Sequence, residues 1–241
     1  MYMGVGSLDV NDLTTVLPGD LRPVIDLDEI ARIMGANGRR LRGSILHEVT
    51  RSITHVKKMM APQCEAVIVP VENCKRGLVV LAQGAELASR KLAKALRDAQ
   101  YAVCFIVTLG EEVDAAIKKH TLAGNVFSGY IMDAIGSAAA ENLAEQFHME
   151  TVKRLNGIGK GGTHRFSPGY CDWPITEQGT LFSVLGEKHA GVSLHNSSLM
   201  IPRKSVSAVF GIIEDVSSGI DPFERYNPCR NCGKKDCVSR R

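Results

Sequence analysis

Apolar and polar positions follow two different periods along this chain. Around residues 44–60, Val49, Ile53 and Val56 recur at the three-to-four-residue spacing that places side chains on one helix face. Short apolar runs such as residues 66–71 have the length and the β-branched content of strands. The patterns predict helices at residues 26–34, 44–60, 86–98, 111–119, 129–155 and 174–185, and strands at residues 66–71, 78–81, 102–109 and 205–213.

Helices and strands alternate in this prediction, which indicates a mixed α and β class without fixing strand direction. Pro70 in the first strand favours a position at the edge or the end of a sheet. The longest predicted helix begins with a run of small residues from Ile135 to Ala140, so we expect another backbone to press on it. Beyond that run, Glu141, Glu145 and His148 are spaced to lie along one face.

Residues 165–173, which we call the clamp loop, combine a permanent cation, a Pro-Gly pair, an aromatic ring, a thiol and the chain's single Trp. Pro168-Gly169 is a turn signal, because Gly accepts the positive φ that such a turn needs. The turn would hold Arg165 near Tyr170, where a guanidinium can bind a carboxylate and a ring can stack on a base. The loop is therefore interpreted as a small-molecule clamp; the alternative is a surface turn with a cation–π contact.

The segment from Gly157 to Gly162 formally satisfies the G-x-G-x-x-G pattern of dinucleotide-binding turns. It follows a predicted helix, whereas a nucleotide-binding turn lies between a strand and a helix. We interpret it as a hinge ahead of the clamp loop.

Composition narrows the class of protein but not the partner. The chain has 241 residues, 44% of them hydrophobic and 23% charged, with a formal net charge of +3, which is ordinary for a globular domain. We expect no nucleic-acid partner, and no apolar run approaches the length of a membrane span. Seven Cys, an odd number without a secretory signal, favour a cytoplasmic location, where clustered thiols bind metal more often than they form disulfides.

The C-terminal segment carries a metal-binding pattern, Cys229-x2-Cys232-Gly-x3-Cys237. A Cys-x-x-Cys-Gly turn directs two thiolates at one ion, and a tetrahedral site needs a fourth ligand. Zinc and an iron–sulfur cluster fit this spacing equally, and the alternative is a basic tail with free thiols. The candidates for the fourth ligand are Cys171, then Cys74 or Cys64.

Three segments resemble one known family. They are Ala-Glu-Asn-Leu-Ala-Glu-Gln-Phe at 140–147, Arg-Phe-Ser-Pro-Gly-Tyr at 165–170 and Gly-Val-Ser-Leu-His-Asn-Ser-Ser-Leu-Met-Ile-Pro-Arg-Lys-Ser-Val-Ser at 191–207, and they follow one another in the family's order. They are similar to signatures of the activation domain of cobalamin-dependent methionine synthase and of its stand-alone homologues. The match is clearest over residues 129–213. We therefore expect an activation-domain-like domain at residues 1–225, followed by a Cys-rich metal-binding tail at residues 226–241.

The resemblance implies an α+β fold with a curved, twisted, mainly antiparallel sheet and surrounding helices. It also implies S-adenosylmethionine binding in support of reductive reactivation, in which cob(II)alamin is reduced by one electron and remethylated. The cobalamin would be carried by a partner chain, a methionine synthase or another corrinoid protein, with flavodoxin or ferredoxin as electron donor.

The residues that match the family's site are Glu145, Arg165, Ser167, Gly169 and Tyr170. Arg165 is expected to hold the methionine carboxylate or a nearby acceptor, Glu145 to bond a donor such as the ammonium group, and Tyr170 to form the catalytic mouth facing the corrin. Two alternatives remain: a metal-binding scaffold that docks on a corrinoid protein without S-adenosylmethionine chemistry, and an ordinary methyltransferase that acts on a small molecule.

Overall fold

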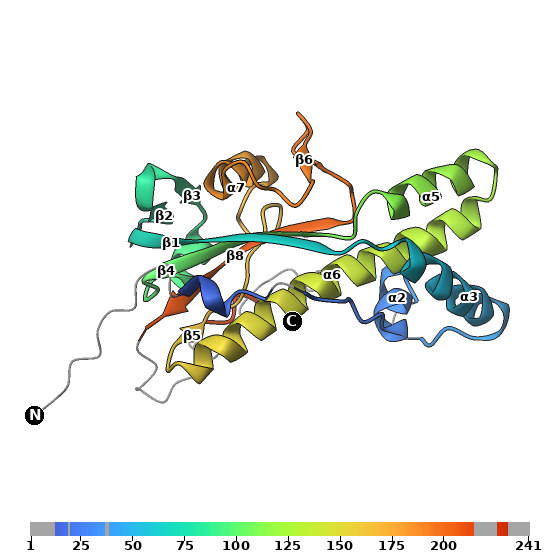
Figure 1. The fold of residues 1–241 in the computed structure, drawn as a ribbon, viewed down its shortest axis with the longest axis horizontal. Coiled ribbons are helices and arrows are strands. Elements are labelled where there is room, and N and C mark those ends of the chain that lie inside the picture. Colours follow the sequence, from blue (N-terminus) through green and yellow to red (C-terminus); the bar gives the residue numbers. More distant parts are fainter. Residues whose placement is uncertain (1–12, 19, 37–38, 215–225, 231–241) are drawn as a thin grey trace, which may run out of the picture.

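The computed structural model of this protein describes residues 13–18, 20–36, 39–214 and 226–230, which form an α+β fold around one antiparallel sheet (Figure 1). Six strands pair in the order β3-β2-β1-β4-β8-β5, and every pairing is antiparallel. The expected fold class is confirmed. The strands of this sheet are β1 (Gln63–Lys75), β2 (Leu78–Leu81), β3 (Glu86–Ala88), β4 (Tyr101–Thr108), β5 (Gly161–Gly162) and β8 (Ser205–Ile213).

Helix α6 (Val126–Gly157) runs along one face of the sheet and is the longest helix in the described ranges (Figure 1). Its 32 residues extend for about 48 Å at 1.5 Å per residue. Despite this length, no helix in the described ranges is apolar enough to cross a membrane. The other elements are η1 (Thr14–Val16), α2 (Leu27–Ile33), α3 (Gly43–Met59), η2 (Ala82–Gly84), α4 (Arg90–Ala95), α5 (Glu112–Leu122), η3 (Ile175–Glu177), α7 (Gln178–Leu185) and the hairpin β6 (Ser193–Leu194) and β7 (Met200–Ile201).

The sheet is buried on both faces, so its central strand alternates between two apolar clusters. Val103 and Phe105 of β4 join the cluster that includes α6, and Phe105 stacks on Phe147 with ring centroids 4.5 Å apart. Cys104 and Ile106 join the second cluster, which includes residues of α4, α7 and the clamp loop. The two clusters fix α6 and the clamp loop relative to the same strands.

The prediction of a helix at residues 86–98 is wrong for residues 86–88, which form a strand. Glu86–Ala88 form β3, where Leu87 pairs with Val79 of β2 and is fully buried. Helix α4 begins only after Ser89, whose hydroxyl accepts a hydrogen bond from the Leu92 amide at 3.0 Å. A Ser at this position is an N-cap signal, and it separates the strand from the helix.

Two further expectations concern the sheet's irregular positions. Pro70 does not end its strand; it lies where the pairing of β1 passes from β4 to β2. Within the glycine run after α6, Gly161 and Gly162 form β5 and pair with β8. Gly162 also packs so closely on Val152 that an added Cβ would lie 2.4 Å from its side chain. These two glycines therefore belong to the packed sheet edge.

Candidate functional site

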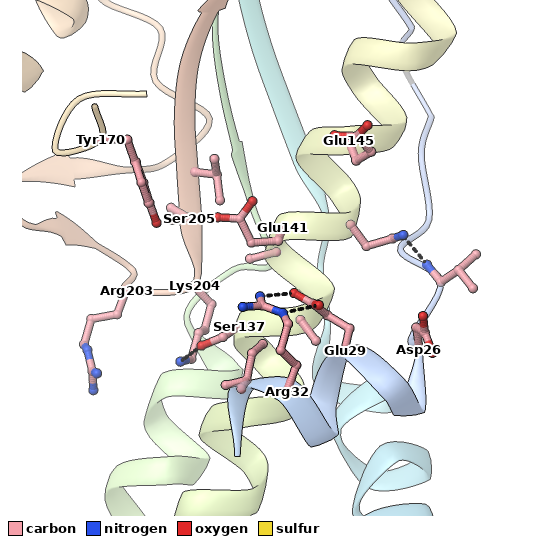
Figure 2. Close-up of a pocket in the computed structure, with 16 residues that line it drawn as sticks. Asp26, Glu29, Arg32, Ser137, Glu141, Glu145, Tyr170, Arg203, Lys204 and Ser205 are labelled. Atoms are coloured by element: carbon pink, nitrogen blue, oxygen red, sulfur yellow. Dashed lines mark hydrogen bonds and ion pairs between the residues drawn. The ribbon is translucent and has the colours of Figure 1, made fainter. Parts of the chain in front are cut away.

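A cavity of about 700 Å³ lies between α2, α6, the clamp loop and the start of β8 (Figure 2). We call it the α6 cavity. Its lining is rich in charged side chains from three separate parts of the chain. The charged and polar residues among those that line it are Asp26, Glu29, Arg32, Ser137, Glu141, Asn142, Glu145, Tyr170, Arg203, Lys204 and Ser205.

The α6 wall of the cavity is built by a simple helical repeat. Ser137, Glu141 and Glu145 are spaced four residues apart, so they follow one another along one face of the helix. The expectation that Glu141 and Glu145 share a face is confirmed, and the face is that of the cavity. His148, expected on the same face, is instead buried and shares a 2.8 Å hydrogen bond with the Thr163 carbonyl oxygen.

Arg165 binds both carboxylates of this wall. Its Nη2 atom lies 2.9 Å from Glu141 Oε2 and its Nε atom 3.3 Å from Glu145 Oε2, while only 9% of the Arg165 side chain is exposed. Phe166, the next residue, exchanges two 2.8 Å backbone hydrogen bonds with Val209 of β8 and so fixes the chain beside the sheet edge. The structure brings Arg165 and Glu145 together, but as partners of one another rather than as two walls of an open clamp.

The predicted Pro-Gly turn in the clamp loop is confirmed. The Tyr170 amide donates to the Ser167 carbonyl at 3.2 Å, and Gly169 between them has a φ of +89°. The turn exposes Tyr170, 40% of which is accessible, and directs it into the cavity lining. Ser167 and Gly169 are not among the lining residues.

Asp172 anchors the clamp loop to the start of α4. Its carboxylate accepts hydrogen bonds from the Ser89 hydroxyl at 2.7 Å and from the Arg90 amide at 2.9 Å. Burial alone would raise the pKa of Asp172, but hydrogen bonds from Ser89 and from the amides of Lys91 and Arg90 outweigh it and lower this pKa. An anion at a helix N-terminus is a favourable arrangement, so the loop has a fixed attachment point.

The opposite end of the α6 wall carries a buried lysine. The Nζ atom of Lys204 lies 2.8 Å from Asp133 Oδ1 and 2.9 Å from Ser137 Oγ, and 5% of its side chain is exposed. Its alkyl chain crosses Gly136, where an added Cβ would come within 3.1–3.2 Å of it. We expected another backbone to pack on this small-residue run. At Gly136 the group that packs on it is the side chain of Lys204. Arg203 adds a second cation, 3.6 Å from the same Asp133 oxygen.

Helix α2 closes the cavity on the third side. Asp26 caps this helix, and its side chain accepts a hydrogen bond from the Asp28 amide at 2.9 Å. Arg32 is held by Glu29 through hydrogen bonds of 2.5 and 2.7 Å. The hydrogen bond to Glu29 is the main cause that raises the pKa of Arg32; burial opposes it, and the charges of Glu29 and of Glu141 across the cavity raise it further.

Most of the charged residues that line the α6 cavity could not be predicted from the sequence, because they come from segments far apart in the chain. The four-residue spacing of Ser137, Glu141 and Glu145 was the one signal that could have extended the site along α6. The charged and polar lining residues that were not predicted as site residues are Asp26, Glu29, Arg32, Ser137, Glu141, Asn142, Arg203, Lys204 and Ser205.

The cysteines are only partly described. Cys171 is exposed in the clamp loop with a φ of +57°, and Cys229 is half-buried. Burial raises the pKa of Tyr226, Lys91 opposes this, and Cys171, Asp172 and Cys229 raise it further. Within the described ranges no three potential metal ligands converge. Cys232 and Cys237 lie outside those ranges.

The two other candidates for a fourth ligand are poorly suited to it. Cys64 and Cys74 both belong to β1, and Cys74 donates to the Leu96 carbonyl oxygen at 3.4 Å. Burial raises the pKa of each thiol to about 11. Since a metal binds the thiolate form, these two sites disfavour ligation.

The sheet, the long helix and the charged cavity define an α+β domain with room for a nucleoside-sized ligand. Residues 92–217, slightly more than half of the chain, match the family described as vitamin B12 dependent methionine synthase, activation domain. The chain therefore belongs to this family, and its expected relationship is confirmed. The matched segment contains α6, the clamp loop and β8, which together supply most of the cavity wall.

A solved structure shows the same fold. The crystal structure of the MetH reactivation domain bound to AdoHcy matches 90% of this chain and 86% of its own chain, with a TM-score of 0.56. The two sequences are 17% identical, a level at which the likeness establishes the shared fold.

Proposed function

We propose that this protein binds S-adenosylmethionine in the α6 cavity and supports the reductive reactivation of a cobalamin-dependent methionine synthase or a related corrinoid methyltransferase. Family membership supports this function, and the similar MetH reactivation domain was crystallised with AdoHcy. The observation that carries the proposal is that two motif residues, Glu145 and Tyr170, come from different elements and line one cavity. The reaction is a methyl transfer, and the corrinoid would arrive on a partner chain.

Each predicted site residue has a role consistent with its position. We propose that Glu145 bonds the ligand's ammonium group and that Tyr170 stands at the mouth toward the corrin. Arg165, which already holds two carboxylates, acts chiefly as a positioning residue that keeps Glu141 and Glu145 in place. Ser167 and Gly169 do not line the cavity, so we propose that they act on the adenosyl moiety through the turn that presents Tyr170. These are binding and orienting roles, which account for large rate effects in transfers between bound groups.

The reduced corrinoid supplies the nucleophilic cobalt that accepts the methyl group. The protein's own contribution is to hold the donor with its methyl group outward and to keep water from the reacting centre. The attachment of the clamp loop through Asp172 serves this, because it fixes the turn that carries Tyr170.

Calorimetric titration of the anaerobically purified chain with S-adenosylmethionine tests the proposal. Tyr170→Ala and Glu145→Ala should weaken binding at least about tenfold, in line with the loss of one strong contact. Tyr130→Ala and Glu150→Ala are the controls of the same residue types; both residues belong to α6, neither lines the cavity, and the variants should bind like the wild type.

Absence of binding by the folded wild type, with or without a corrinoid protein, would remove the S-adenosylmethionine function. The scaffold that docks on a corrinoid protein would then be the better explanation. Turnover of a small-molecule acceptor without any corrinoid would instead favour an ordinary methyltransferase.

We further propose that residues 226–241 form a metal-binding tail on the domain of residues 1–225, with Cys171, Cys229, Cys232 and Cys237 as ligands. The support is the Cys229-x2-Cys232-Gly-x3-Cys237 spacing together with the exposure of Cys171 in the clamp loop. Tyr226 precedes this pattern by three positions. The Nζ atom of Lys94 lies 4.9 Å from the centre of the Tyr226 ring. Cations beside clustered thiolates would offset their repulsion, and a zinc ion or an iron–sulfur cluster there would lie next to the clamp loop.

Metal analysis and visible absorption of anaerobically purified protein test this tail. An absorbing cluster indicates iron–sulfur, whereas a colourless protein with bound metal indicates zinc. Cys171→Ser and Cys229→Ser should both lower the metal content, and Cys64→Ser on β1 should not. A wild-type chain without metal, or metal content that neither substitution changes, would refute the tail as a metal site.

A further inference from the structure

Asn142 belongs to α6 and lines the cavity three positions before Glu145. Side chains three positions apart on a helix are neighbours on its surface, with Cβ atoms about 5–6 Å apart. The cavity wall therefore places a neutral amide next to the carboxylate for which we propose a role in ammonium binding. The proposed function leaves this amide without a role.

The amide of Asn142 is fixed in orientation by two donors. Its Oδ1 atom accepts a hydrogen bond from the Val24 backbone amide at 2.7 Å and another from Gln146 Nε2 at 2.8 Å. A backbone N–H can only donate, so the oxygen of Asn142, and not its nitrogen, faces Val24. The two hydrogen bonds occupy both lone pairs of this oxygen. The Nδ2 group is therefore directed away from the Val24 amide.

The Nδ2 group of Asn142 has two N–H donors that the protein does not use within the described ranges. The residue is half-buried, and Nδ2 is not among the buried polar atoms that lack a partner in those ranges, so it is accessible. An amide that is held by its oxygen and open at its nitrogen is a preformed donor. A ligand acceptor beside Glu145 would meet it without any rearrangement of the side chain.

The cationic side chains of the site are poorly placed for an acceptor beside Glu145. Only 9% of the Arg165 side chain is exposed, and it already takes part in two ion pairs with α6. Lys204 is bound to Asp133, which is twelve positions from Glu145, or about 18 Å along the helix. Figure 2 shows the cations of the lining toward the end of the wall opposite to Glu145: Arg32, Lys204 and Arg203.

We propose that the Asn142 amide donates a hydrogen bond to the carboxylate of the amino-acid part of S-adenosylmethionine, while Glu145 binds its ammonium group. The inference rests on the proposed function and adds a specificity-determining residue to it. An amino acid carries both groups on one carbon, so neighbouring side chains are suited to bind them. Asn142 and Glu145, three positions apart on α6, meet this requirement. The pair distinguishes S-adenosylmethionine from sulfonium compounds without the carboxylate, such as its decarboxylated form.

The loss of one donor to a charged acceptor sets the size of the effect. Hydrogen bonds to charged groups are stronger than those between neutral groups, and solvent access at a half-buried side chain weakens them. We expect Asn142→Ala to weaken S-adenosylmethionine binding about tenfold. Binding of decarboxylated S-adenosylmethionine should change less than about threefold, because that ligand has no carboxylate that could lose the contact.

The experiment measures both ligands by calorimetry on the full chain, for the wild type, Asn142→Ala, Asn142→Asp and a control. Asp at this position keeps an oxygen for Val24 and Gln146 but has no donor, so it separates the ligand contact from the attachment of Val24. It should weaken S-adenosylmethionine binding at least as much as Ala does, without weakening binding of the decarboxylated ligand, which also shows that the variant is folded. Asn125→Asp adds the same charge at the N-cap of α6, outside the cavity lining, and should bind both ligands like the wild type.

Equal weakening of both ligands in Asn142→Ala would assign this residue to holding Val24 and overturn the inference, as would unchanged S-adenosylmethionine binding in both variants. A wild type that binds the decarboxylated ligand as tightly as S-adenosylmethionine would show that the carboxylate is not recognised, with the same consequence. Each of these results leaves the proposed function intact. A wild type that binds neither ligand would overturn the proposed function and the inference together.

Discussion

Arg165→Gln tests whether the α6 wall depends on the guanidinium that binds both Glu141 and Glu145. The change removes two charge-assisted contacts, at 2.9 and 3.3 Å, from a side chain that is 9% exposed. Hydrogen bonds to charged groups contribute about 1.5–3 kcal/mol each, but partners exposed by one third lower that value. Uncompensated repulsion between carboxylates four residues apart adds about 0.2–0.5 kcal/mol. We expect a loss of about 2–3 kcal/mol in the free energy of unfolding.

Thermal and urea unfolding measure this loss. For a domain of this size, each kcal/mol lowers Tm by about 2–4 °C, so a loss of about 2–3 kcal/mol corresponds to a decrease of about 4–12 °C. The double variant Arg165→Gln/Glu141→Gln should recover part of it, because the repulsion is removed. Arg51→Gln breaks an exposed Arg–Glu helix pair of 2.7 Å and serves as the control. If Arg165→Gln lowers Tm no more than Arg51→Gln, the wall is not held by this guanidinium.

Two other predictions concern residues around the same site. Burial lowers the pKa of His148 from its usual 6.5 to about 4, so the unfolded chain binds the proton more tightly than the folded chain. The free energy of unfolding should therefore fall by at most about 3 kcal/mol as the pH decreases from 6.5 to 4. Urea unfolding of His148→Gln should show a flatter pH dependence over this range; an identical slope would contradict the assignment. Gly169→Ala should lower stability by about 1 kcal/mol and weaken S-adenosylmethionine binding, because its φ is +89° and an added Cβ would lie 3.1 Å from Ile175. Gly179→Ala, in an open position of α7, should cost nothing in the same assays; equal effects of the two changes would refute the turn argument.

The elements with a strong local signal could be predicted from the sequence. The strand expected at residues 205–213 is β8, and the helix expected at residues 129–155 lies inside α6. The turn of the clamp loop also followed from Pro168 and Gly169 alone. In each case the signal, a period or a turn pair, is contained within a few neighbouring residues.

The arrangement of the site could not be predicted in the same way. The contact of Arg165 with Glu141 depends on the pairing of Phe166 with Val209 at the sheet edge, which joins segments more than forty positions apart. The contribution of α2 depends on how the N-terminal part packs on α6, and no local pattern reveals that. Helix residues 86–88 were mispredicted because their composition suits a helix, whereas their pairing with β2 determines the observed strand.

The crossing of Lys204 over Gly136 makes these two positions interdependent for protein engineering. Because Lys204 is held at its end by Asp133 and Ser137, its stem cannot move aside without lengthening those bonds. A larger residue at position 136 should therefore be tolerated only together with a shorter residue at 204. The two substitutions would then be strongly non-additive, and the size of the cavity could be adjusted only by changing both as a pair.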